Sequence, residues 1–216
     1  VAAAIWTLWA FAARGAANFD DMVQDVADAL IWVKENRRTE TLAPDAPLVF
    51  GGYSSGGHVA ASLLQRPDLF EGRGLPPPEK LCDAVLMVSG VLCNGLQNQT
   101  KKGTGMTSTE DRSPRWFTDL VTETVFGGEN AMLVPSPVHG NGKTRLPHVL
   151  LGCENEVFGI NWLDAFFCSK DFAASLKNDG IPVRYVEVKS DHWNILGSRA
   201  LSDALREELR LILQTK

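Results

Sequence analysis

The stretch Pro47-Leu48-Val49-Phe50-Gly51-Gly52-Tyr53-Ser54-Ser55-Gly56-Gly57-His58-Val59-Ala60-Ala61 decides the class of fold. Its first residues form an apolar run that predicts a buried strand over 47–51. The apolar residues that follow the glycines predict a helix over 55–65. A G-x-S-x-G sequence between a strand and a helix is typical of a nucleophile elbow, a turn that presents a reactive serine. The alternative is a structural tight turn or a phosphate-binding loop.

The spacing of the glycines selects one serine in this turn. The turn is so tight that the residues two before and two after the nucleophile must be small, and Gly52 and Gly56 satisfy this around Ser54. Ser55 would need glycine at position 53, where the chain has Tyr53. Ser54 is therefore the predicted nucleophile.

Strand and helix patterns alternate along the rest of the chain. Strands are predicted at 82–89, 147–152 and 182–188, and helices at 20–37, 161–178 and 199–214. This alternation predicts an α/β fold in which helices flank a mainly parallel sheet, with residues 1–216 in a single domain. The polar stretch 94–115, rich in Gly, Thr and Lys, predicts a lid or a disordered loop.

Composition excludes several classes of function. The chain has 216 residues, 44% hydrophobic content and a net charge of -5, without a basic cluster that would bind nucleic acid. Four cysteines are widely spaced and form no C-x-x-C pair. We therefore expect buried free thiols rather than disulfides or metal ligands, and we expect no metal.

A serine nucleophile needs a general base, and His192 is the best candidate. It follows the strand at 182–188 and precedes the last helix, and functional groups gather at the carboxyl ends of parallel strands. His58 would point away from the site and is expected to be structural. His139 and His148 are expected to be surface or packing residues.

The base in turn needs an orienting carboxylate. With a nucleophile elbow the chain order is serine, acid, histidine, so the acid should follow the strand at 147–152. The spacing from Pro147 favours Glu156, and Glu154 is the alternative. Without a serine and a histidine in register, either residue would be a solvated loop carboxylate.

Four segments together resemble the α/β-hydrolase superfamily, and within it the esterase/lipase group that includes kynurenine formamidases and isoprenylcysteine methylesterases. They are residues 18–26, residues 52–58, the pair Ser136-Pro137 and residues 190–194. The resemblance implies a carboxylesterase-like serine hydrolase that acts on a small-molecule ester or amide through an acyl-serine intermediate. Its Ser-His-Glu triad would need no metal or organic cofactor.

The resemblance also implies an oxyanion hole, half of which comes from a His-Gly-Gly-type motif upstream of the elbow. The sequence given contains no such motif. Residues 1–5 would correspond to the strand after it, so we expect the chain to be a C-terminal portion that lacks the N-terminal strands. The remaining oxyanion donor would be the backbone amide of Ser55. Loss of one donor typically costs about 2.7 to 4 kcal/mol of transition-state stabilisation.

Two other interpretations remain open. The first is a non-catalytic protein of hydrolase fold that binds a small apolar ligand or a protein partner, because the motif is absent and the acid is a glutamate. The second concerns the apolar segment 1–13, which is too short to span a bilayer. Membrane contact through this segment, with Trp6 and Trp9 at an interface, is a weaker expectation than a remnant of a core strand.

Overall fold

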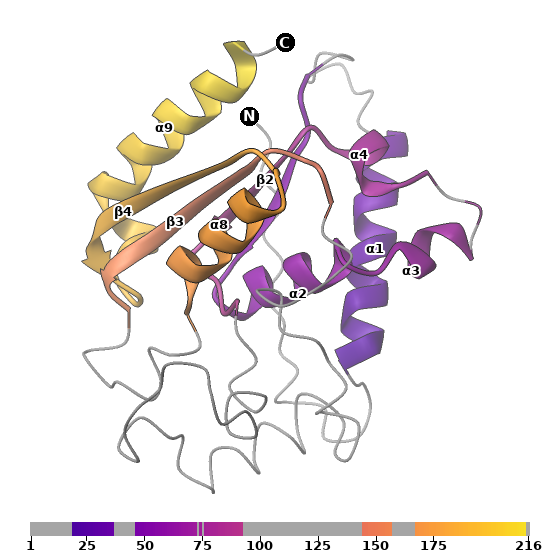
Figure 1. The fold of residues 1–216 in the computed structure, drawn as a ribbon, viewed down its shortest axis with the longest axis horizontal. Helices are drawn as coiled ribbons and strands as arrows, with labels where there is room; N and C mark the ends of the chain where they lie inside the picture. Colours follow the sequence, from indigo (N-terminus) through magenta and orange to yellow (C-terminus); the bar gives the residue numbers. More distant parts are fainter. Residues whose placement is uncertain are drawn as a thin grey trace, which may run out of the picture.

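The computed structural model describes residues 19–36, 46–72, 74, 76–92, 144–156 and 167–214. The described strands form one four-stranded sheet in the order β1-β2-β3-β4, and each neighbouring pair is parallel (Figure 1). The strands are β1 (Val49–Tyr53), β2 (Ala84–Val88), β3 (His148–Asn155) and β4 (Val183–Asp191). The predicted strands and the predicted parallel sheet are therefore confirmed, with β3 and β4 each running three residues further than expected.

The helices predicted from apolar periodicity are also present. They are α1 (Phe19–Asn36), α2 (Ser55–Leu63), α8 (Ser169–Asn178) and α9 (Arg199–Gln214). Short helices that the sequence pattern did not indicate are α3 (Pro67–Glu71), α4 (Pro78–Leu81) and the 3-10 turn η5 (Ile195–Gly197). The predicted lid at 94–115, the segment 1–13, Ser136-Pro137, His139 and the first part of the helix expected from 161 lie outside the described residues.

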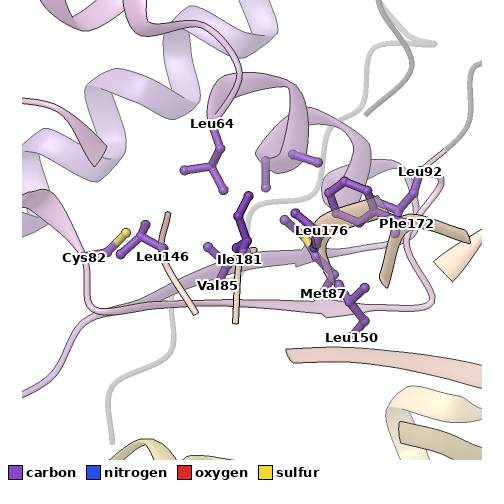
Figure 2. Close-up of a cluster of buried hydrophobic side chains, with 12 residues drawn as sticks. Leu64, Cys82, Val85, Met87, Leu92, Leu146, Leu150, Phe172, Leu176 and Ile181 are labelled. Atoms are coloured by element: carbon purple, nitrogen blue, oxygen red, sulfur yellow. The ribbon is translucent and has the colours of Figure 1, made fainter. Parts of the chain in front are cut away.

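Helices cover both faces of the sheet, and alternate residues of the strands show which face is which. Val85 and Met87 of β2 pack in a cluster with residues of α2 and α8, which Figure 2 shows in close-up. Val88, at the end of the same strand, packs in a second cluster with residues of α9. Figure 1 shows α9 on one side of the sheet and α2 with α8 on the other. The sheet is thus the middle layer of three.

The helix that leaves the elbow is buried on both sides. Every residue of α2 from Gly57 to Leu63 is buried. Val23 of α1, Leu63 of α2 and Phe70 of α3 are at most 1% exposed and belong to one apolar cluster. Removing such a side chain typically costs about 2 to 5 kcal/mol, so packing holds the start of α2 firmly against the sheet.

The carboxyl ends of the four strands meet at one edge of the sheet, as parallel pairing requires. Two hydrogen bonds tie neighbouring ends together. The amide of Ser54, just after β1, donates to the carbonyl of Val88 at 3.1 Å, and the amide of Ser89, just after β2, donates to Leu151 at 2.7 Å. This edge carries the polar residues described below.

The cysteines depart from expectation at one position. Cys82 and Cys153 are buried and free, as predicted. Burial raises the pKa of each thiol to about 12, which keeps both protonated at neutral pH. Cys168, half-buried at the start of α8, is in a disulfide, so the expectation of a free thiol is wrong there. Spacing along the sequence does not reveal which cysteines the fold brings together.

Candidate active site

Ser54 stands where β1 ends and α2 begins, in a conformation that is uncommon for residues other than glycine. Its backbone has φ 55° and ψ -126°, a sparsely populated combination that costs about 1–3 kcal/mol and persists only when the surroundings impose it. The surroundings here are hydrogen bonds to both sides of the residue. The Ser54 amide donates to Val88, and its carbonyl accepts from the amide of Val91 at 3.1 Å. Ser54 itself is half-buried.

The two glycines of the elbow have different roles. A Cβ atom on Gly52 would lie 2.3 Å from the backbone of Gly56, so position 52 must be glycine in this turn. A Cβ atom on Gly56 would meet no described atom within 4 Å outside its own helix turn. The collision expected at Gly56 is therefore not found among the described atoms. Gly57 is more crowded than Gly56, since a Cβ atom there would lie 2.9 Å from the Cα of Gly90.

His192 reaches Ser54 from the end of β4. The Nε2 atom of His192 lies 2.9 Å from the Oγ of Ser54, and His192 is 3% exposed. The turn that carries it is built on Asp191, whose Oδ1 accepts from the amides of Trp193 and Asn194 at 3.0 Å each. The side-chain hydrogen bond from Asn194 is the main cause that lowers the pKa of Asp191. Asp191 thus stays ionised and fixes the turn.

Aromatic rings enclose the imidazole. The Tyr53 ring is stacked on the His192 ring with centroids 5.0 Å apart, and its hydroxyl donates to the backbone carbonyl of His192. Phe167 packs edge-on against the imidazole at 4.7 Å, and Trp193 does so at 5.2 Å. Burial, followed by the nearby acidic groups, raises the pKa of Tyr53, so its hydroxyl remains a donor. These contacts restrict rotation of the imidazole.

Glu156 lies behind the imidazole, on the side away from Ser54. Its Oε1 accepts from the amide of Cys153 at 3.0 Å, and its carbonyl accepts from the amide of His192 at 3.0 Å. The Oε2 atom is 3.7 Å from Nδ1 of His192, which is longer than a hydrogen bond. Glu154, the alternative acid, is exposed, and no hydrogen bond or ion pair joins it to His192.

Ser89 fills the space between Glu156 and His192, and sequence reasoning missed it. Its Oγ donates to Oε2 of Glu156 and lies 2.6 Å from Nδ1 of His192. The residue is fully buried, and its φ of 44° is also in the left-handed region. A weak signal was available, because Ser89 is a polar residue at the carboxyl end of a predicted strand.

The other described histidines lie away from this group. His58 is buried, and its Nδ1 donates to the carbonyl of Val91 at 2.8 Å. Burial lowers the pKa of His58 to about 4, so the ring is neutral above that pH. His148 is buried at the start of β3, with Nδ1 at 2.7 Å from the carbonyl of Leu146. Both side chains pack within the protein; the backbone amide of His58 donates to the carbonyl of Ser54 at 3.4 Å, as part of the first turn of α2.

The amide of Ser55 has the position expected of an oxyanion donor. Ser55 is the first residue of α2, so its N–H has no acceptor within the helix. The helix N-terminus also carries a partial positive charge. Developing negative charge beside Ser54 would therefore meet both a donor and a favourable dipole.

No group of three or more His, Cys, Asp and Glu side chains in the described part of the chain is arranged to hold a metal ion. None of its helices combines the length and apolar character needed to cross a membrane.

The structure is similar to solved esterases. It matches an esterase from Pyrobaculum calidifontis with a TM-score of 0.64 at 16% identity, covering 93% of this chain and 62% of that one. It matches esterase B from Lactobacillus rhamnosis with a TM-score of 0.64 at 15% identity, covering 91% and 61%. A thermophilic esterase from Thermogutta terrifontis gives 0.59 at 20% identity, covering 92% and 67%.

These similarities identify the fold as that of the α/β-hydrolases. The chain spans 62% and 61% of the length of the first two esterases. No protein-family model matches the sequence, and no curated protein matches it.

Proposed function

We propose that the chain is a serine hydrolase that cleaves carboxylic esters or related acyl bonds through an acyl-serine intermediate. One observation carries the proposal. The fold holds Ser54 in a strained elbow conformation with its Oγ 2.9 Å from Nε2 of a buried histidine. A serine hydroxyl at hydrogen-bond distance from a neutral imidazole is the arrangement that activates it as a nucleophile.

In the first half of the reaction, the Oγ of Ser54 attacks the carbonyl carbon of the ester while Nε2 of His192 accepts its proton. The carbonyl oxygen becomes an oxyanion, which the Ser55 amide stabilises by donating a hydrogen bond. The tetrahedral intermediate collapses, the bond to the leaving oxygen breaks, and His192 returns the proton to that oxygen. The products of this half are an alcohol and an acyl ester on Ser54.

In the second half, water attacks the acyl carbon while His192 again accepts a proton. Collapse of the second intermediate returns the proton to Ser54 and releases the carboxylic acid. Glu156 keeps the imidazole in the correct tautomer and stabilises its protonated form. These two half-reactions use only groups of the protein and one water molecule.

The proposed substrate class is a small-molecule ester, with an amide as the second choice. The solved proteins of similar fold are named as esterases, and the Thermogutta enzyme is described with butyrate bound. The narrower resemblance to kynurenine formamidases and isoprenylcysteine methylesterases stays a prediction. Hydrolysis of a formamide in preference to an acetate ester would favour the first of these groups.

The test is covalent labelling of the full chain with a fluorophosphonate probe, together with turnover of p-nitrophenyl acetate. We expect wild-type protein to be labelled on Ser54, and Ser54→Ala to be neither labelled nor active. Ser55→Ala is the matched control, because it removes an adjacent hydroxyl and leaves the backbone amide in place. Absence of labelling and turnover in folded wild-type protein would instead favour a non-catalytic protein that binds an apolar ligand or a partner.

A further inference from the structure

We propose that Ser89 is a positioning residue through which Glu156 acts on His192. This inference rests on the proposed function, because it assigns the group that orients the general base. The acid, a serine hydroxyl and the histidine form a relay behind the nucleophile, so four side chains rather than three make up the catalytic group.

The distances indicate that Glu156 contacts His192 through Ser89 rather than directly. Oε2 of Glu156 and Nδ1 of His192 are 3.7 Å apart, whereas N–H to O hydrogen bonds span about 2.7–3.2 Å. The Oγ of Ser89 is 2.6 Å from the same Nδ1 and is also bonded to Oε2 of Glu156. The hydroxyl therefore makes the contact that the carboxylate itself does not.

The protons can be arranged in one consistent way. For Nε2 of His192 to accept the proton of Ser54, it must be unprotonated, so the ring proton of the neutral imidazole sits on Nδ1. That N–H donates to the Oγ of Ser89. The single proton of Ser89 is then free to donate to Glu156, whose ionised carboxylate only accepts. Each donor in this series of hydrogen bonds, from His192 through Ser89 to Glu156, therefore meets an acceptor.

The relay favours the charged state of the imidazole without moving a proton along it. When His192 takes the proton of Ser54, its Nδ1–H becomes a stronger donor, and the Ser89 hydroxyl is polarised toward the carboxylate. Other titratable groups around the ring are Tyr53, which stacks on it, Cys153, which adjoins Ser89 and Glu156, and Asp191, which precedes it. Among the described side chains, the Ser89 hydroxyl is the group within hydrogen-bond distance of Nδ1, and the Glu156 carboxylate lies 3.7 Å from it.

The backbone holds Ser89 in place relative to the elbow. Its own amide is bonded to Leu151 of β3, and two residues later the Val91 amide donates to the carbonyl of Ser54. The carbonyl of Val91 accepts from His58 of α2. The segment after β2 is thus tied to both the nucleophile and the helix that follows it. The left-handed φ of Ser89 is consistent with a position imposed by these contacts.

The first test is Ser89→Ala, compared with wild type on p-nitrophenyl acetate. We expect kcat to fall by about 10- to 100-fold with KM unchanged, as for the loss of one hydrogen bond to a charged group. The acid limb of the pH profile should move to lower pH, because the imidazolium loses its acceptor. Ser62→Ala is the matched control. Ser62 is a buried serine of α2 whose hydroxyl has no hydrogen-bond partner among the described residues, and its removal should change neither kcat nor the pH profile.

A second variant separates the hydroxyl from the backbone. Ser89→Gly also removes the hydroxyl, but glycine adopts a positive φ without strain, so this variant is expected to fold at least as well as Ser89→Ala. Equal kinetic defects in the two variants would support the relay. Wild-type kcat and an unshifted pH profile in either folded variant would overturn it, because Glu156 would then pair directly with His192.

A spectroscopic measurement tests the relay independently of activity. NMR of the ¹⁵N-labelled His192 ring should show the Nδ1–H tautomer with a downfield proton in wild type, and loss of that signal in Ser89→Gly. If fluorophosphonate fails to label wild type but the signal depends on Ser89, the proposed function fails and the positioning role stands. If the signal is the same in both proteins, the positioning role fails whatever the labelling shows.

Discussion

The Oγ of Ser54 and the Nε2 of His192 are 2.9 Å apart in the fold, although the two residues are separated by 138 positions in the sequence. They follow β1 and β4, the outer strands of the described sheet. With strands about 4.8 Å apart, these ends are about 14 Å from each other. The turn built on Asp191 and the stacking on Tyr53 place His192 back over the carboxyl edge of the sheet, close to Ser54. Ser89 and Glu156, which follow the two intervening strands, lie next to its imidazole.

Glu156→Gln is expected to lower ester turnover by about 10² to 10⁴-fold while leaving the fold intact. One carboxylate oxygen accepts from the Cys153 amide and the other accepts from the Ser89 hydroxyl. A glutamine offers one acceptor oxygen, so its NH₂ must face one of these two donors. If it faces Ser89, the hydroxyl turns toward His192 and forces the wrong imidazole tautomer. The measurement is kcat/KM on an aryl ester, with thermal unfolding as the check on folding.

Glu154→Gln is the comparison that separates the two acids. Glu154 is exposed and has no bond to His192, so its change should alter kcat/KM by less than about 3-fold, as is usual for surface substitutions. The reverse ranking of the two variants would move the orienting role to Glu154.

Tyr53→Phe should weaken the hold on the imidazole without removing the stacked ring. The lost hydroxyl bond to the His192 carbonyl is worth about 1 kcal/mol, so the free energy of unfolding should fall by that amount and kcat should fall a few-fold. Tyr53→Leu also removes the stack and should reduce kcat further. Urea unfolding and steady-state kinetics measure the two effects. Equal kcat values for the two variants would show that the ring contributes nothing to positioning.

The parts of the fold that were predictable depend on local patterns. Alternation of strand and helix signals predicted the parallel sheet. The residues around Ser54 predicted the elbow because the tight turn requires glycine at a position close to Ser54 in the sequence. His192 was predicted from its place directly after the strand at 182–188, which is again a local pattern. Glu156 also needed the order of serine, acid and histidine along the chain, which comes from the class of fold.

The features that were missed depend on how distant segments meet. Ser89 bridges Glu156 and His192 because β2 lies between β1, which ends at the elbow, and β3, which leads to Glu156. No local sequence pattern at Ser89 indicates that β3 is its neighbour. Cys168 is in a disulfide for a similar reason, since pairing is a property of the fold. The crowding expected at Gly56 is not found among the described atoms, because the position of its Cβ depends on how α2 leaves the turn.

Gly52→Ala and Gly56→Ala should therefore differ in effect. The methyl group added at position 52 would lie 2.3 Å from the backbone of Gly56, so the elbow must shift, and we expect lost fluorophosphonate labelling and lower stability. Gly56→Ala places its methyl group where no described atom lies within 4 Å, and it gains helix propensity, worth up to about 1 kcal/mol. Thermal unfolding and labelling of both variants check this. Equal damage from the two changes would restore the original steric interpretation of Gly56.

Acid should destabilise the protein through His58, a residue that takes no part in the proposed chemistry. Burial against α1, with Phe19 beside the ring, lowers the pKa of His58 from 6.5 to about 4 in the folded state. Between these values the unfolded chain binds a proton at His58 that the folded chain does not. The free energy of unfolding therefore falls as pH falls from about 6.5 to 4, by on the order of 3 kcal/mol in total, and this contribution is complete above pH 7.

His58→Asn isolates this effect, because an asparagine amide nitrogen takes the place of Nδ1 and can still donate to the carbonyl of Val91, but does not titrate. Carboxylates contribute equally to both proteins, so the difference between them reports His58 alone. We expect the free energy of unfolding of wild type, measured in urea, to drop between pH 7 and pH 5 by about 2 kcal/mol more than that of the variant. If both proteins lose the same amount over this interval, the pKa of His58 is not lowered by folding, and the ring becomes protonated in the folded state over the same pH range as in the unfolded chain.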